Sequence, residues 1–105
     1  MPTLSLAGLS LDPATRMVRV DAGEPRRLTQ LEFRLLYTLM AHRGQVLPAD
    51  AIVEHVWGYT DAGSRDLVRG LVNRLRAKVE AEPRQPRFVR TIPGVGYAFG
   101  DVEPT

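Results

Sequence analysis

Residues 64–81 carry the pattern that most restricts how this chain can fold. With about 100° per residue in an α-helix, the apolar residues at every third or fourth position fall within about 40° of the first of them, Val68. Leu71 flanks this stripe, which consists of Val68, Val72, Leu75 and Val79. Pro83 follows, and proline does not continue a helix. We therefore predict a helix with Ser64 as its N-cap, ending near Ala81 and packing its stripe against a core.

Two more helices are predicted upstream. Thr29 and Glu32 have the spacing of a capping box, in which each side chain satisfies the other residue's free backbone N–H. Apolar residues at helical spacing follow, and Gly44 is a suitable C-cap. The next helix has Pro48 in its first turn and ends by Trp57-Gly58. It presents to the core the apolar residues Ile52, Val53 and Val56.

Short alternating runs on both sides of the helices predict strands. Those in residues 4–28 are separated by turn residues and indicate a small antiparallel meander, while residues 45–47 are enough for one bridging strand. Residues 87–92 and 97–99 flank a glycine-rich tip and predict a β-hairpin. A chain of 105 residues is one domain. Its parts are a sheet region (1–28), a helical and hairpin region (29–100) and a polar tail (101–105).

Composition excludes several classes of function. The chain has no cysteine, so it has no disulfide and no thiolate site. It has no apolar run of about 20 residues and no signal-peptide pattern at its start, so we expect a cytoplasmic protein without a membrane partner. His42 and His55 lie on different predicted helices with no carboxylate at ligand spacing, so no metal or cofactor is predicted. No nucleophile or acid–base pair indicates an enzyme.

The charge is unevenly distributed. The whole chain has a net charge of +2, but residues 65–90 hold eight basic and three acidic side chains, a net of +5. Opposite the apolar stripe of the third helix lie Asp66, Gly70, Asn73 and Ala77, with Arg69 and Arg76 along one edge and Arg74 and Lys78 along the other. Arg76 and Glu80 have the i,i+4 spacing of an ion pair, whereas Asp66 and Arg69 have no charged residue four positions on, which predicts few internal partners for these bases and a polyanionic ligand.

Small and hydrogen-bonding residues between two rows of cations suit a helix in the DNA major groove. The candidates to face bases are Arg69, Gly70, Asn73, Arg74 and Ala77. The candidates to contact phosphates are Trp57, Arg65, Arg76, Lys78, Arg90, Thr91 and Tyr97. Two of these have a second interpretation. A mid-helix glycine costs about 1 kcal/mol, so Gly70 indicates either close approach to the bases or a tolerated surface residue. For Trp57 a packing anchor is the favoured interpretation, and contact of its ring edge with a phosphate is the alternative.

Several segments together resemble the DNA-binding effector domain of OmpR/PhoB-type response regulators. They are Leu28–Leu36, Gly44–Leu47, Val56–Gly58, Asn73–Val79 and Arg90–Tyr97. The resemblance implies an α+β winged helix-turn-helix with an N-terminal four-stranded antiparallel sheet, three helices and a C-terminal β-hairpin. It also implies sequence-specific double-stranded DNA binding in transcription regulation within a two-component system, with helix 64–80 in the major groove and hairpin 87–99 on the backbone. Family partners would be a second copy on direct-repeat sites and RNA polymerase, through loop 58–63.

Three departures from the family pattern qualify this expectation. A receiver domain usually precedes the effector, and 105 residues leave no room for one, so an isolated domain and a stand-alone regulator both stay open. Pro93 replaces a basic residue in the wing, which leaves the wing as a phosphate contact through Arg90 and Thr91. Asp66-Leu67 replaces a common Arg-Thr, so Arg65 takes over the phosphate contact there. The alternative, motivated by Pro93 and Asp66, is a winged-helix protein-interaction module with little DNA affinity.

Overall fold

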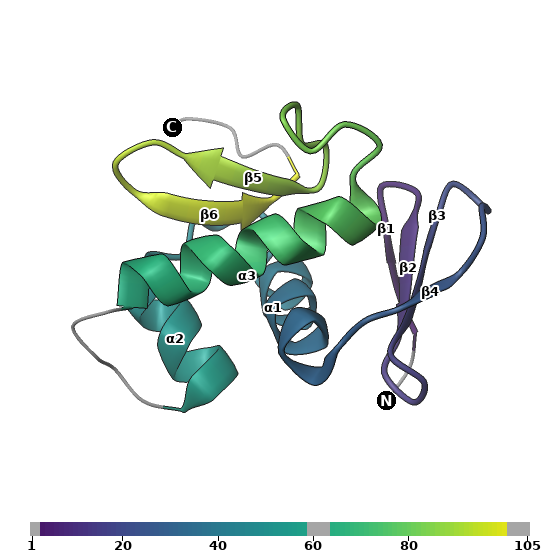
Figure 1. Cartoon of the computed structure of the whole chain (residues 1–105), viewed down its shortest axis with the longest axis horizontal. Helices are drawn as coiled ribbons and strands as arrows, with labels where there is room; N and C mark the ends of the chain where they lie inside the picture. Colours follow the sequence, from purple (N-terminus) through teal and green to yellow (C-terminus); the bar gives the residue numbers. More distant parts are fainter. Residues whose placement is uncertain (1–2, 59–63, 101–105) are drawn as a thin grey trace.

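The computed structural model describes residues 3–58 and 64–100 of the chain. Helix α3 runs along one side of the molecule, the terminal hairpin lies beside it, α1 and α2 pack beneath it, and the N-terminal sheet stands at its carboxyl end (Figure 1). The elements in chain order are β1 (Leu4–Leu6), β2 (Leu9–Asp12), β3 (Met17–Val20), β4 (Arg26–Arg27), α1 (Gln30–Ala41), α2 (Ala49–Trp57), α3 (Ser64–Val79), β5 (Val89–Ile92) and β6 (Gly96–Phe99). This architecture confirms the predicted winged helix-turn-helix.

The N-terminal sheet is an antiparallel meander in the order β1-β2-β3-β4. Leu11 pairs with Leu4 on one side and with Val18 on the other, so the apolar members of the strands share one face. That face is buried at Leu9, Leu11 and Val18. The alternation read from the sequence therefore sets both the register and the side of the sheet that meets the helices.

Helix α1 begins with the predicted capping box. Glu32 N donates to Thr29 Oγ1 at 3.2 Å, and Thr29 N donates to Glu32 Oε1 at 2.9 Å. The helix ends at Ala41 with His42 as its C-cap, so the prediction of Gly44 as the cap was wrong. Gly44 instead has φ +84° in the turn that follows, a left-handed conformation that glycine adopts without strain.

Helices α2 and α3 differ from their predicted limits by one or two residues. Pro48 is the N-cap of α2 rather than a residue of its first turn, and Gly58 ends that helix with φ +85°. Helix α3 ends at Val79 instead of Ala81. The side chain of Ser64, its predicted N-cap, lies outside the described residues, as do residues 59–63 and the tail 101–105.

The core lies between the three helices, the inner face of the sheet and the root of the hairpin. Helix α3 packs against both α1 and α2. Its apolar stripe is fully covered, as the sequence predicted, because Val68, Val72, Leu75 and Val79 are all buried. Burial of this stripe fixes which face of α3 is left for solvent.

The hairpin is attached to the connection between α1 and α2 by one bridge. Leu47 N donates to Tyr97 O at 2.8 Å, and Tyr97 N donates to Leu47 O at 2.9 Å. This is the single bridging strand predicted for residues 45–47. A Cβ added at Gly96 would collide with the backbone at Leu47 and Pro48, so the close approach requires glycine there. Within residues 3–58 and 64–100, no helix combines the length and apolar character that crossing a membrane requires.

Candidate nucleic-acid interface

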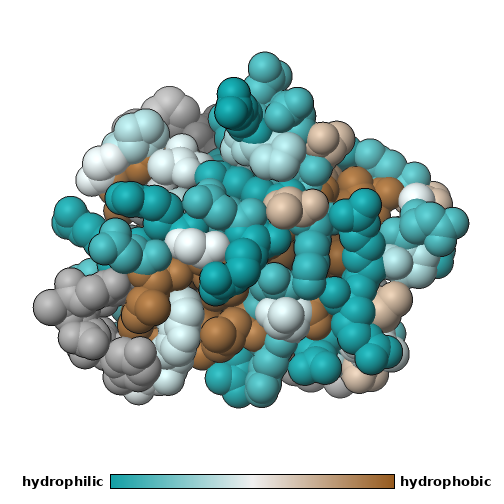
Figure 2. Space-filling model, in the orientation of Figure 1, coloured by the Kyte–Doolittle hydropathy of each residue, from teal (hydrophilic) through white to brown (hydrophobic). Residues whose placement is uncertain are grey.

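The outer face of α3 is a polar surface edged by cations. Gly70, at its centre, is half-buried. The other residues at its centre and edges are exposed: Arg65, Arg69, Asn73, Arg74 and Ala77. Hydrophilic residues dominate the middle of the molecular face that carries α3 (Figure 2). The predicted base-facing residues therefore share one accessible surface. Their contact with bases stays a prediction.

An open groove of about 510 Å³ lies between α3 and the hairpin. Asn73 and Arg76 line it from the helix, and Arg90 and Thr91 from β5. The structure thus brings together two groups of candidates that the sequence identified separately. Arg84, in the segment between α3 and β5, lines the same groove and was not singled out from the sequence. Its position depends on how that segment folds back, for which the sequence carries no periodic signal.

Arg76 is turned toward the hairpin. Its Nε donates to Val89 O at 2.9 Å, and its Nη2 donates to Thr91 Oγ1 at 2.7 Å. The predicted Arg76–Glu80 ion pair was wrong, because β5 offers Arg76 nearer acceptors. Burial lowers the pKa of Arg76, and the charges of Glu80 and Tyr97 oppose that shift. Because arginine only donates, Thr91 Oγ1 accepts, and the Thr91 hydroxyl hydrogen remains available to a phosphate.

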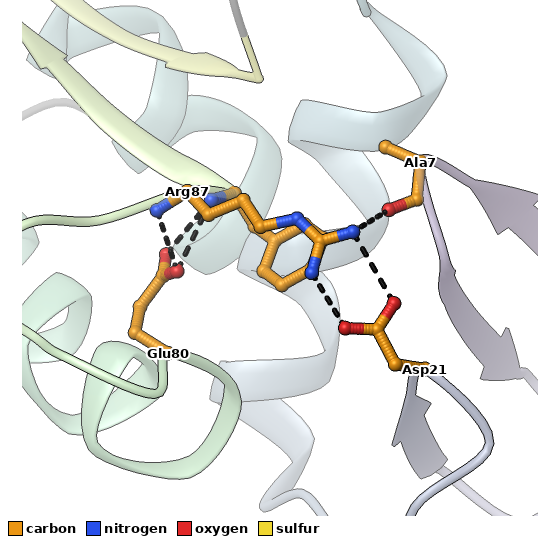
Figure 3. Close-up of polar contacts among 5 residues, drawn as sticks. Ala7, Asp21, Glu80 and Arg87 are labelled. Carbon is orange, nitrogen blue, oxygen red and sulfur yellow. Dashed lines mark hydrogen bonds and ion pairs between the residues drawn. The ribbon is translucent and has the colours of Figure 1, made fainter.

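Glu80 fixes the start of β5 to the end of α3. Its carboxylate, on a residue only 7% exposed, accepts backbone N–H bonds from Arg87 at 2.7 Å, Phe88 at 3.1 Å and Val89 at 2.8 Å. Figure 3 shows this carboxylate turned toward the backbone at Arg87, two residues before β5 begins. Buried N–H groups need acceptors, so Glu80 fixes the position of the start of the hairpin relative to the end of α3. Its role was not predicted, since the spacing to β5 is not local.

Arg87 extends away from the groove, toward the N-terminal sheet (Figure 3). Its guanidinium donates to both carboxylate oxygens of Asp21, at 2.7 and 3.2 Å, and to Ala7 O at 2.6 Å. The hydrogen bond to Asp21 raises the pKa of Arg87 and lowers the pKa of Asp21. Gly8, beside this contact, has φ +88°, a left-handed conformation that favours glycine. Arg87 is therefore committed to the fold and is not part of the hairpin's contact surface.

Lys78 also has internal partners. Its Nζ donates to Glu32 Oε1 at 2.6 Å and to Arg27 O at 3.2 Å. The expectation that the bases of this region have few internal partners was therefore wrong for Arg76, Lys78 and Arg87. In contrast, the pair between Arg69 and Asp66 is loose, at 3.9 Å between two highly exposed side chains.

We expect the Glu32 carboxylate to make a pH-dependent contribution to the free energy of unfolding. Burial raises the pKa of Glu32, but the hydrogen bonds from Lys78 and from Thr29 N lower it by more than burial raises it. The pKa therefore lies below the ordinary value of 4.5. The ionised form therefore stabilises the fold above pH 4.5, and this contribution is lost as pH falls through the lowered pKa. We expect Glu32→Gln to reduce the free energy of unfolding by about 1 kcal/mol at pH 7.

Urea denaturation from pH 7 to pH 2 checks this prediction. The difference between the original protein and Glu32→Gln is expected to be constant above about pH 5 and to shrink below pH 4.5. Glu24→Gln, a change of an exposed carboxylate in the N-terminal region, is the matched control. A difference that grows as pH falls would contradict the assignment.

The two aromatic phosphate candidates take part in packing. Trp57 and Tyr97 are both half-buried and lie against the core cluster. This favours the packing interpretation of Trp57, while the part of each side chain that remains accessible leaves a phosphate contact possible. No group of three or more histidine, aspartate or glutamate side chains in residues 3–58 and 64–100 is placed to hold a metal ion.

Comparison with known proteins places this geometry in one family. The family model described as "Transcriptional regulatory protein, C terminal" matches residues 23–99. The DNA-binding response regulator MtrA of Mycobacterium tuberculosis is 45% identical over 98 residues, which cover 92% of this chain and 42% of MtrA. The DNA-binding dual master transcriptional regulator RpaA of Synechocystis is 40% identical over 91% of this chain and 39% of its own length. The chain thus spans about two fifths of these curated relatives.

Solved structures agree with the sequence comparison. The DNA-binding domain of RstA from Klebsiella pneumoniae, crystallised with the RstA box, superposes with a TM-score of 0.84 at 31% identity, covering 95% of this chain and 98% of RstA's. The response regulator DrrB of Thermotoga maritima, an OmpR/PhoB homologue, gives a TM-score of 0.80 at 27% identity, over 94% of this chain and 44% of its own. The chain therefore belongs to the OmpR/PhoB-type family of C-terminal domains of transcriptional regulatory proteins.

Proposed function

We propose that this chain binds double-stranded DNA sequence-specifically and serves as the output domain of a response regulator. Helix α3 enters the major groove, where Asn73 and Arg74 read base edges and Arg69 borders them. Thr91 and Arg90 of the hairpin contact the adjacent backbone. Membership of this family of transcriptional regulators supports action in the cytoplasm, which we propose for this chain.

The outer face of α3 is the observation that carries this proposal. Its buried stripe leaves exposed a row of small and amide residues, with arginines at both edges. The side chains of Arg65 and Arg74 have no ion-pair or hydrogen-bond partner within residues 3–58 and 64–100, so their guanidinium groups are available to a ligand. Since Arg76 and Lys78 are bonded within the molecule, we assign to them the positioning of the hairpin and of α1 rather than the main phosphate contacts.

Selection from random duplexes, followed by titration at several salt concentrations, tests the proposal. Each phosphate neutralised contributes about −0.9 to the slope of log K against log salt, so phosphate contacts by Arg65 and Arg90 predict a slope near −2. We expect one enriched sequence motif and this salt dependence. Absence of duplex binding at low salt would overturn the proposal and favour a winged-helix module that binds protein instead.

Substitution of Gly70 distinguishes its two interpretations, a close approach of the α3 backbone to the bases and a tolerated surface residue. A Cβ added there would meet only Arg74 Nη1, at 4.0 Å, so the free protein has room for it. Gly70→Ala is therefore expected to raise the free energy of unfolding by about 0.5–1 kcal/mol. If the helix backbone lies against the bases, the same change lowers DNA affinity several-fold.

Thermal unfolding and duplex titration of the same variant measure the two effects. Ala77→Gly, the reverse change on the same face, serves as the control, and it should lower stability while leaving room for the duplex. A Gly70→Ala protein that is more stable and binds the selected duplex unchanged would show that Gly70 is only a tolerated surface residue.

We also propose that two copies bind side by side on direct-repeat sites. The family membership and the single reading helix of the domain support this, because one α3 spans only part of a typical operator. A duplex with two copies of the selected motif should bind two molecules, and one with a single copy should bind one. Equal stoichiometry on both duplexes would contradict the proposal. A contact of loop 58–63 with RNA polymerase stays a prediction, since residues 59–63 lie outside the described part.

A further inference from the structure

Two histidines on separate helices lie side by side in the fold. His42 is the C-cap of α1, and His55 lies in the last turn of α2. The centroids of their rings are 5.2 Å apart, with the ring planes tilted by 50°. The prediction that these residues form no metal site rested on their lying on different helices and on the lack of a carboxylate at ligand spacing, and the packing of α1 against α2 brings the two rings together.

The separation of the two ring centroids is compatible with two imidazoles that share one metal ion. Imidazole nitrogens bind Zn²⁺ at about 2.0–2.1 Å, and a tetrahedral angle between two such bonds places the ring centroids about 5 Å apart. Imidazole is also a preferred ligand of Cu²⁺ and Ni²⁺. We propose that His42 and His55 together bind one divalent transition-metal ion of this class between α1 and α2.

The surroundings of His42 support this role. Its Nδ1 lies 2.8 Å from Thr38 O, and a carbonyl oxygen can only accept, so Nδ1 carries the hydrogen. The Nε2 atom then has the free lone pair. Metal-binding histidines commonly donate their second ring nitrogen to a backbone carbonyl, which orients the ring and fixes its tautomer. The bond between His42 Nδ1 and Thr38 O is already present in the fold, so His42 needs no rearrangement to offer Nε2 to a metal ion.

The His55 side supplies an accessible second ligand. His55 is exposed, and its side chain forms no hydrogen bond with any residue in 3–58 or 64–100. Because no third protein ligand is grouped with the pair in those residues, water completes the coordination. Such a site is exchangeable rather than permanently occupied. An ion held there would join α1 to α2 and stabilise the folded state by mass action.

Metal titration of the tag-free chain tests the proposal independently of DNA binding. In ¹H–¹⁵N NMR spectra, substoichiometric Cu²⁺ is expected to broaden resonances centred on His42 and His55. Calorimetry with Ni²⁺ or Zn²⁺ is expected to give one ion per chain, and Mg²⁺, which prefers oxygen ligands, is expected to give none. His42→Gln and His55→Gln should each weaken binding by at least about tenfold.

Glu54→Gln, a change of an exposed carboxylate on α2 next to His55, is the matched control and should leave binding unchanged. Two results would overturn the proposal. One is broadening centred on the amino terminus or on carboxylates. The other is unchanged affinity in His55→Gln, which removes an exposed side chain and so keeps the fold even if His42→Gln does not.

Discussion

Glu80→Gln is expected to lower the free energy of unfolding by about 3 kcal/mol, although it changes one atom. The Glu80 carboxylate accepts bonds from three consecutive backbone N–H groups of the wing root. Glutamine has one oxygen and an NH₂ group that cannot accept, so at least one buried N–H loses its partner. Each such loss costs about 1–3 kcal/mol, and the remaining bonds lose the charge that strengthens them.

Urea denaturation measures this loss, and amide hydrogen exchange locates it. Exchange should accelerate first at residues 87–92, while the buried stripe of α3 stays protected at Val72 and Leu75. Glu82→Gln, a change of an exposed carboxylate in the same connection, should alter stability by less than about 0.5 kcal/mol. Equal effects of the two substitutions would show that Glu80 does not fix the wing.

Arg74→Ala is expected to weaken binding to the selected duplex about ten- to hundredfold, with little change in stability. Arg74 is exposed on α3 and has no partner within residues 3–58 and 64–100, so its loss leaves no buried group unsatisfied. An arginine that reads guanine contributes about 1–3 kcal/mol of discrimination. The variant should therefore lose sequence preference at one position of the site.

Titration against the selected duplex and its single-base variants measures this effect. Arg19→Ala, which removes an exposed arginine of β3 in the N-terminal sheet, is the control and should change affinity much less. If Arg74→Ala lowers affinity equally on every duplex and reduces the salt slope by about one, Arg74 contacts a phosphate instead. Unchanged affinity would remove Arg74 from the interface.

Local chemistry made much of this fold predictable. The Thr29–Glu32 capping box and the α3 stripe involve residues within one or two helical turns, and both appear as expected. The hairpin and the Leu47 bridge also follow from short strand signals. The capping box and the hairpin join residues that are close in sequence, and the apolar periodicity of α3 leaves one way to bury its stripe, whereas the Leu47 bridge has a distant partner, Tyr97.

The polar contacts were less predictable because they depend on competition between distant groups. Helical spacing put Glu80 within reach of Arg76, yet β5 supplies better partners to both residues. The same holds for Lys78, which reaches Glu32 of α1, and for the two histidines that helix packing brings together. Sequence spacing identifies possible neighbours, but the tertiary fold determines which of them pair.

The central claim is that the outer face of α3, with the adjacent hairpin, forms the DNA contact surface. A ¹H–¹⁵N NMR titration with the selected duplex tests it directly. We predict that the largest amide shifts fall in residues 65–77 and 89–97, with small changes in the N-terminal sheet. Shifts concentrated in residues 4–27, with α3 unaffected, would contradict the claim.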